Sequence, residues 1–279
     1  MAILTNNLVL PKGSLKKDGV TFYKRNGQTV MRSATTEQPR RNSRNQFVAR
    51  QRLANNMGLW KALLEATKPL LTGGKSNYGR FCTLMRKMPV VFLTRDERRR
   101  GASLMLPGMP VSDGMLPDIE YRLGEVDGCP ALLTSLRVSK HSATLVGALF
   151  GRGADLKNSD RLELYRLEQQ QGVQGESLPK VRARVETLTN ADSENPQPFR
   201  DIELREVHGR LALVGEVFGD EMKGWALVRR DAEDLRVSSQ RIVTPCRLYE
   251  QYTTEEALQR SAESYGGLTF SPYLTPDGE

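Results

Sequence analysis

Hydrophobic positions in the first part of the chain recur at helical spacing. From Phe47 to about Leu64, the spacing i, i+4, i+7 and i+11 predicts a helix with one buried apolar stripe, formed by Leu53, Met57, Trp60 and Leu64. Residues 75–88 repeat the periodicity, and Pro69 with Gly73 marks the break between the two segments. We expect two antiparallel helices that bury their stripes against each other.

Alternation of apolar and polar residues predicts strands on both sides of these helices. Residues 19–32 place β-favouring side chains around Asn26-Gly27, a strong hairpin signal because both turn residues tolerate positive φ. Residues 89–93, PVVFL, predict a further strand. From about residue 117 onward the period is two, and we place strands at 119–124, 131–137, 143–150, 161–168, 180–188, 201–207, 210–218, 223–230 and 235–243.

These elements predict an α+β fold. We expect a basic N-terminal hairpin plus a helical pair, followed by an antiparallel β-sandwich. The predicted parts are a basic α+β region at 1–115, the sandwich at 116–250, and a short helix with an irregular tail at 251–279. The helix of this last part covers 253–264 and is capped by Thr253 or Thr254.

Charge is distributed unevenly along the chain. The first hundred residues carry 21 Lys or Arg against 5 Asp or Glu, a formal +16, whereas the other 179 residues carry 20 against 28, a formal −8. A split of this size creates one region that attracts anions and another that repels them. The partner is therefore expected to be an anionic polymer or the acidic region of another copy.

The residue types that support catalysis or metal binding are few and widely spaced. The three cysteines (Cys82, Cys129, Cys246) form no CxxC pair, and the two histidines lie 67 positions apart. The GKS at 74–76 lacks the first glycine of a phosphate-binding loop, because Pro69 occupies that position. We therefore expect no enzyme activity, no cofactor and no metal.

The N-terminus, MAILTNNLVLPKGS, has no basic residue before its apolar stretch, and no run approaches the roughly 18 apolar residues that a membrane span needs. We expect no signal peptide, no membrane partner, and a cytoplasmic or virion-associated location.

The basic half supplies the candidate binding residues. Seven arginines are expected to contact an anionic partner: Arg40, Arg41, Arg44, Arg52, Arg98, Arg99 and Arg100. The leading hypothesis is a non-enzymatic structural or assembly protein, such as a virion or tail-like particle component, that self-associates through its basic N-terminal pole and acidic C-terminal region. The alternative is a sequence-nonspecific nucleic-acid-binding protein, although aromatic residues for base stacking make up only 6% of the chain.

Five stretches carry a resemblance to a known family. They are YKRNGQTVMRS at 23–33, RNQFVARQRLA at 44–54, MPVSDGMLPDI at 109–119, SDRLELYRL at 159–167 and GWALVRRDAEDLRVSSQRI at 224–242. In this order they are similar to a bacterial family defined as a domain of unknown function, with a basic N-terminal hairpin and helical part before an Ig-like β-region. The resemblance implies a two-part, β-rich, non-enzymatic protein, and it implies no catalytic residue or cofactor.

Overall fold

The chain forms two compact units in a computed structural model. Unit 1 comprises residues 1–44 and 269–279, and unit 2 comprises residues 45–268. The structure describes the strands at 2–3, 15–17, 20–25 and 28–33, and residues 43–268 except 67–68, 73, 75, 141, 172–177, 196–197 and 234. The predicted binding residues Arg40 and Arg41 lie outside the described residues.

Unit 1 contains a four-stranded antiparallel sheet in the order β1-β4-β3-β2. Its strands are β1 (Ala2–Ile3), β2 (Leu15–Lys17), β3 (Val20–Arg25) and β4 (Gln28–Ser33). Arg25 pairs with Gln28, so only two residues connect β3 to β4. This register confirms the hairpin that Asn26-Gly27 predicts.

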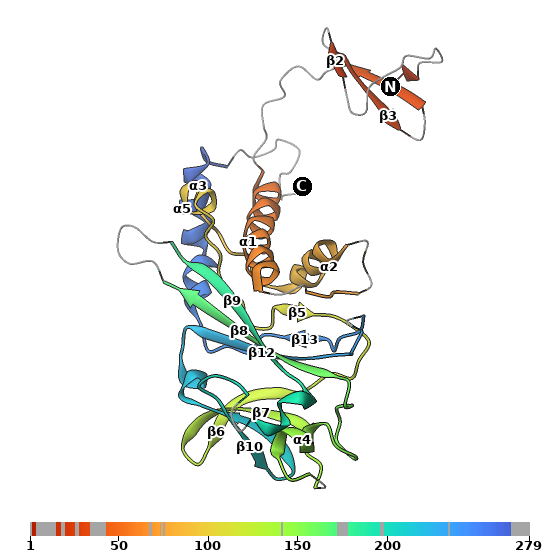
Figure 1. The fold of residues 1–279 in the computed structure, drawn as a ribbon. Helices are drawn as coiled ribbons and strands as arrows, with labels where there is room; N and C mark the ends of the chain where they lie inside the picture. The colour runs from red at the N-terminus through yellow and green to blue at the C-terminus, as the bar shows by residue number, and fades with distance from the viewer. Residues whose placement is uncertain are drawn as a thin grey trace, which may run out of the picture. The chain divides into compact units, whose positions relative to one another are not determined.

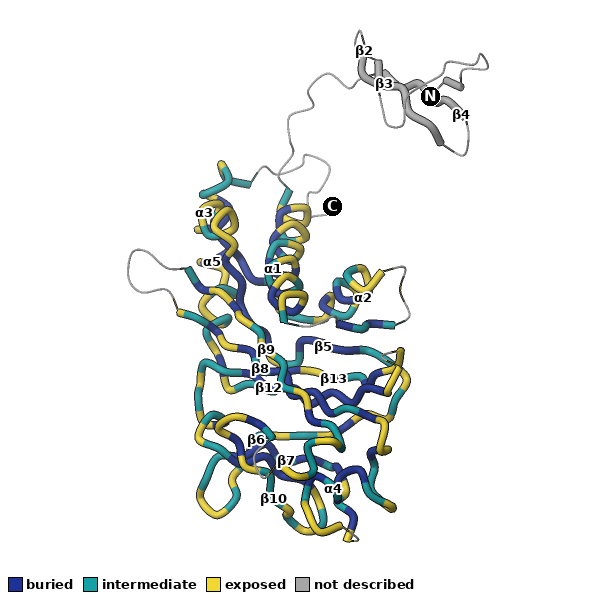
Figure 2. The backbone as a smooth tube through the Cα atoms, in the orientation of Figure 1, coloured by how far each residue is buried: buried dark blue, intermediate teal, exposed yellow. Residues whose placement is uncertain are grey.

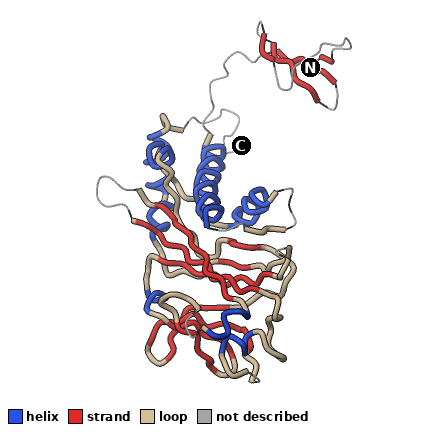
Figure 3. Tube along the Cα trace, in the orientation of Figure 1, coloured by secondary structure: helices blue, strands red, loops and turns tan. Residues whose placement is uncertain are grey.

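The described α-helices of unit 2 other than α4 (Leu145–Leu149) gather on one side of its strands (Figures 1 and 3). They are α1 (Arg44–Ala66), α2 (Asn77–Leu84) with the 3₁₀ turn η1 (Met85–Lys87), α3 (Arg95–Arg99) and α5 (Glu255–Ser264). Side-chain caps fix three of the starts, since the side chains of Ser76, Thr94 and Thr254 accept hydrogen bonds from backbone amides three residues on. The predicted helices at 47–64, 75–88 and 253–264 are confirmed, and α3 was not predicted.

The predicted buried stripe of α1 is wrong. Leu53, Met57 and Leu64 are 46%, 46% and 50% exposed, and the helix instead buries Phe47, Gln51, Asn55, Asn56, Leu59, Ala62 and Leu63. The reason is the neighbour of α1, an extended segment whose backbone groups need hydrogen-bond partners. The amide of Asn55 supplies them, because Oδ1 accepts from Leu104 N at 2.8 Å and Nδ2 donates to Leu104 O at 3.1 Å.

The predicted strand at 89–93 is also wrong. The segment is extended but joins no sheet. Leu93 donates to Gln51 Oε1 at 3.1 Å and accepts from Ser261 Oγ at 2.6 Å, while Phe92 donates to the Tyr252 carbonyl at 2.8 Å. Side chains from α1 and α5 therefore take the place of a paired strand.

A central antiparallel sheet in the order β12-β8-β9 forms the middle layer of unit 2. Its strands are β8 (Arg161–Gln170), β9 (Lys180–Leu188) and β12 (Lys223–Arg230). One face, with Tyr165 and Val228, joins the core beneath the helices, and the other, with Leu164 and Trp225, joins a second core. Because both faces are covered, β8 and β12 are largely buried (Figure 2).

A second antiparallel sheet in the order β10-β11-β7-β6 covers the other face. Its strands are β6 (Tyr121–Val126), β7 (Cys129–Arg137), β10 (Glu203–Val207) and β11 (Arg210–Val214). A two-stranded sheet pairs β5 (Pro110–Ser112) with β13 (Gln240–Arg241). The remaining elements are α4 (Leu145–Leu149) and the 3₁₀ turns η2 (Asn190–Glu194), η3 (Glu216–Gly219) and η4 (Leu248–Tyr252).

Helices and antiparallel sheets together confirm the predicted α+β class. Six of the nine strands predicted after residue 117 match strands in type and position. The strand at 143–150 is wrong, because Thr144 caps the helix α4 by accepting from Gly147 N at 3.2 Å. The strand at 210–218 ends at Val214, and only Gln240–Arg241 of 235–243 forms a named strand.

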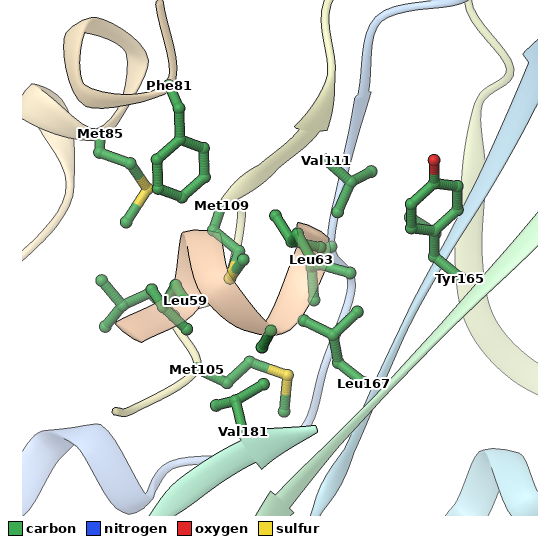
Figure 4. Packing of buried hydrophobic residues seen from close by; sticks show 14 of the residues in the cluster. Leu59, Leu63, Phe81, Met85, Met105, Met109, Val111, Tyr165, Leu167 and Val181 are labelled. Atoms are coloured by element: carbon green, nitrogen blue, oxygen red, sulfur yellow. The ribbon is translucent and has the colours of Figure 1, made fainter. Parts of the chain in front are cut away.

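The core under the helices is aliphatic and rich in methionine (Figure 4). Leu59 and Leu63 of α1 point into it, toward Met105 and Leu167, and all four side chains are fully buried. The core therefore joins helices and sheet into one compact unit.

Candidate functional site

A groove runs along the exposed side of α1. It encloses about 440 Å³ between α1, the turn after α3 and the start of β9. Leu53 and Met57 contribute large apolar side chains to its lining, and Lys61, Glu65, Arg98, Lys180 and Arg182 contribute charged ones. Its size falls within the range of roughly 300–1,000 Å³ that is typical of binding pockets.

Close contact between backbone segments forms the floor of the groove. A Cβ atom on Gly58 would lie only 2.7 Å from Ser103 Cβ, so the glycine lets α1 approach the 102–103 segment. Ser103 in turn donates from its backbone N to Pro179 O at 2.9 Å and accepts from Val181 N at its Oγ at 3.1 Å. These contacts fix the helix against the start of β9 and keep the groove open between them.

The groove has a positive rim. Four cations and one carboxylate line it, a formal +3. Within the described ranges, the side chains of Lys61, Arg98, Lys180 and Arg182 are exposed and form no ion pair. Other arginines of unit 2 differ, since Arg80 bonds Asp113 at 2.6 Å and Arg100 lies 3.5 Å from Asp96. The rim is therefore available to an anionic partner.

The arginines selected from the sequence are not gathered at one place. Arg98 lines the groove, whereas Arg99 and Arg100 are exposed at the end of α3. Arg44 is exposed at the first residue of α1. Arg52 is half-buried, and its Nε is enclosed without a hydrogen-bond partner among the described atoms.

The sequence does not predict most of the rim. Lys180 and Arg182 lie on the polar face of a strand that the alternating pattern assigns to solvent, and they are distant from the basic first hundred residues. Leu53 and Met57 were assigned to the core. One signal in the sequence bears on which side of α1 is buried. Polar Gln51 and Asn55 lie on the side of the helix opposite Leu53 and Met57.

A second cavity, of about 630 Å³, lies over β6, β7 and β11 near the turn at His208. Tyr121 lines it, and its hydroxyl donates to Arg241 O at 2.6 Å. Burial raises the pKa of Tyr121 above its usual value, so this hydroxyl keeps its proton. In the described part of the cavity lining, His208 has no hydrogen bond to a carboxylate, so no acid–base pair is formed.

Among the described residues, no three His, Cys, Asp or Glu side chains converge as metal ligands. Within the same ranges, every helix is too short or too polar to span a bilayer.

Comparisons with known proteins give no match to a protein-family model, a curated protein or a solved structure. The geometry and charge of the groove are therefore the features of this chain that bear on its function.

Proposed function

We propose that this chain is a non-enzymatic assembly protein that binds an acidic, apolar surface of a partner through the α1 groove. The observation that carries the proposal is the position of Leu53 and Met57, nearly half exposed, inside a rim of cations that have no ion-pair partner among the described residues. An apolar centre surrounded by charge is the usual arrangement of a protein-binding site.

The aromatic side chains favour a protein partner over a nucleic acid. Nonspecific single-strand binding uses exposed rings on which bases stack. Trp60 instead packs against Tyr78 and Phe81, with ring centroids 5.8 and 5.5 Å away. The exposed apolar side chains of the groove are aliphatic, and these contribute little to base stacking but much to a protein interface.

The charge of unit 2 supports association between copies. Residues 45–100, which contain most of α1 and all of α2 and α3, carry 12 Lys or Arg against 3 Asp or Glu. Residues 101–268 carry 20 against 26. One compact unit therefore combines a basic and an acidic region, which favours a heterologous contact between copies.

The test is the solution mass of the full chain by light scattering over a range of protein concentrations, in low and high salt. We expect concentration-dependent oligomers that weaken with salt, because the rim is charged. The double variant Leu53→Gln, Met57→Gln should remain monomeric. The matched control is Leu64→Gln, which changes an equally exposed leucine of the same helix outside the groove lining and should assemble normally.

Two outcomes would overturn the proposal. The first is a wild-type chain that stays monomeric at high concentration and low salt, and the second is a groove variant that assembles as well as wild type. A monomer whose mass changes only when nonspecific DNA is added, with a steep salt dependence, would establish the nucleic-acid alternative instead.

A further inference from the structure

The large hydrophobic side chains exposed on the described part of unit 2 occur at two places. Leu53, Met57 and Leu64 are on α1, and Met115 and Leu235 are on two loops, where they are 79% and 66% exposed. Exposed apolar groups of this size on a rigid surface are typical of interaction sites. The two places differ in their charged neighbours.

Met115 and Leu235 lie on loops that are joined to each other. We define the acidic loop pair as residues 113–118 together with 231–233 and 235–236. Leu116 donates at 3.0 Å from its backbone N to the carbonyl oxygen of Val237, the residue directly after the second loop, and a Cβ atom on Gly114 would clash with that same oxygen. The two loops are therefore in contact on both sides of Met115.

Hydrogen bonds hold the second loop in one conformation. Asp231 Oδ1 accepts from the backbone N of Leu235 at 2.9 Å and of Arg236 at 3.0 Å, and its Oδ2 accepts from Arg236 Nε at 2.9 Å. The first loop is fixed in the same way, since Ser239 N donates to Asp118 Oδ1 at 2.8 Å and Gly114 N donates to Ser239 Oγ at 3.0 Å. A loop pair fixed before binding loses little conformational entropy when it binds.

The charge of the loop pair is opposite to that of the groove. It contains four carboxylates and one guanidinium, a formal −3 that the pairing of Asp113 with Arg80 reduces to −2, against the formal +3 of the groove lining. Glu233 and Asp118, on the same loops as the apolar side chains, are exposed and form no ion pair within the described residues. The groove has aliphatic residues inside a cationic rim. It is therefore suited to bind a surface on which apolar side chains occur together with carboxylates.

We infer that the acidic loop pair of one copy binds in the α1 groove of a second copy, with Met115 and Leu235 against Leu53 and Met57. This inference rests on the proposed function and names the partner surface. Two grooves facing each other would bring like charges together, so the contact joins unlike surfaces. In Figure 1, β9 begins on the left of the view, whereas β5 and β13 lie to the right, so both surfaces of one copy are able to engage neighbours.

Contacts between unlike surfaces build rings or filaments. Stable interfaces bury roughly 1,000 Å² or more, and we expect a single contact between one loop pair and one groove to be weak. Assembly should therefore depend strongly on protein concentration.

The test uses two full-length variants, each with one surface disabled. The groove variant is Leu53→Gln, Met57→Gln, and the loop variant is Met115→Gln, Leu235→Gln. Each should raise the dissociation constant of self-association by at least about tenfold. Mixed in equal amounts, they should form a dimer and no larger species, because each supplies the surface that the other lacks. Leu64→Gln is the control in all mixtures, since its assembly should match wild type.

Each outcome of this experiment is decisive. A loop variant that assembles like wild type, while the groove variant does not, overturns the inference and leaves the proposed function intact. If both variants are monomeric and their mixture is monomeric too, groove and loop pair do not bind each other, and the inference fails. If the groove variant itself assembles normally, the proposed function is wrong, and the inference that rests on it is wrong as well. Circular dichroism of each variant separates lost binding from lost folding.

Discussion

Arg230 on β12 donates hydrogen bonds to both carboxylate oxygens of Glu163 on β8, at 2.8 and 3.1 Å, and both side chains are less than 10% exposed. The neighbouring residue, Arg229, forms a second buried pair with Asp160 at 2.6 Å. Successive residues of a strand point to opposite faces, so β12 places one ion pair on each side of the central sheet. The sheet is covered on both faces, and each charge has its partner inside the protein.

Removing one member of such a pair should be costly. We expect Glu163→Gln to lower the free energy of unfolding by about 3–5 kcal/mol, because the buried guanidinium of Arg230 then loses the carboxylate that accepts two of its hydrogen bonds. The control is Glu168→Gln, on the same strand but exposed and without an ion pair in the described structure. Chemical denaturation measures both, and equal effects of the two variants would show that the buried pair contributes nothing.

Replacing a buried amide with a hydrocarbon should also destabilise the protein. Asn55→Leu removes the partners of the Leu104 N–H and C=O groups, and a buried polar group without a partner costs about 1–3 kcal/mol. The matched change on the exposed side, Leu53→Gln, should leave the free energy of unfolding within about 0.5 kcal/mol. If Asn55→Leu proves as stable as wild type, the amide is dispensable.

The class and order of elements could be predicted from the sequence because these depend on local periodicity. The alternation of Val181, Ala183 and Val185 with charged residues is realised in β9, and Thr254 caps α5 as its position suggested. Such signals lie within one element, so no knowledge of the neighbouring chain is needed.

The buried face of α1 could not be predicted in the same way. Apolar count favours the stripe with Leu53 and Met57, but the extended segment at 102–106 requires hydrogen-bond partners, which Asn55 and Gln169 provide. That requirement arises from a segment far along the chain. The groove could not be predicted for the same reason, because Lys180 lines it from a strand more than a hundred residues after α1.

Gly58 offers a test of the groove floor. In an exposed helix, Gly→Ala gains about 1 kcal/mol, but here the new Cβ atom would lie 2.7 Å from Ser103 Cβ. We expect Gly58→Ala to lower the midpoint of thermal unfolding. Because Ser103→Gly removes the side chain that the new Cβ atom would meet, Gly58→Ala should lower the midpoint less in a Ser103→Gly background than in the wild-type chain. A single variant that is more stable than wild type would mean that α1 has room to move away.

The acidic loop pair should loosen in acid. Burial alone raises the pKa of Asp231, but hydrogen bonds from Arg236 and from the amides of Leu235 and Arg236 outweigh it, so its pKa lies below the usual value of about 3.9. The folded state therefore binds this proton less tightly than the unfolded chain does. The resulting stability is fully present above about pH 5 and is lost as the pH falls through the lowered pKa.

Asp231→Asn tests this relation, because the asparagine keeps one carbonyl oxygen for the two amides but loses the charge that faces Arg236. We expect the variant to be less stable than wild type at neutral pH, by less than Glu163→Gln, because Arg236 is largely exposed and solvent screens the pair. Denaturation curves across the acidic range should show this difference shrinking below about pH 4. The control, Glu233→Gln, changes an exposed carboxylate of the same loop and should be close to wild type at neutral pH. A difference for Asp231→Asn that persists undiminished at the lowest pH would mean that the side chain stabilises the loop by its shape and not by its charge.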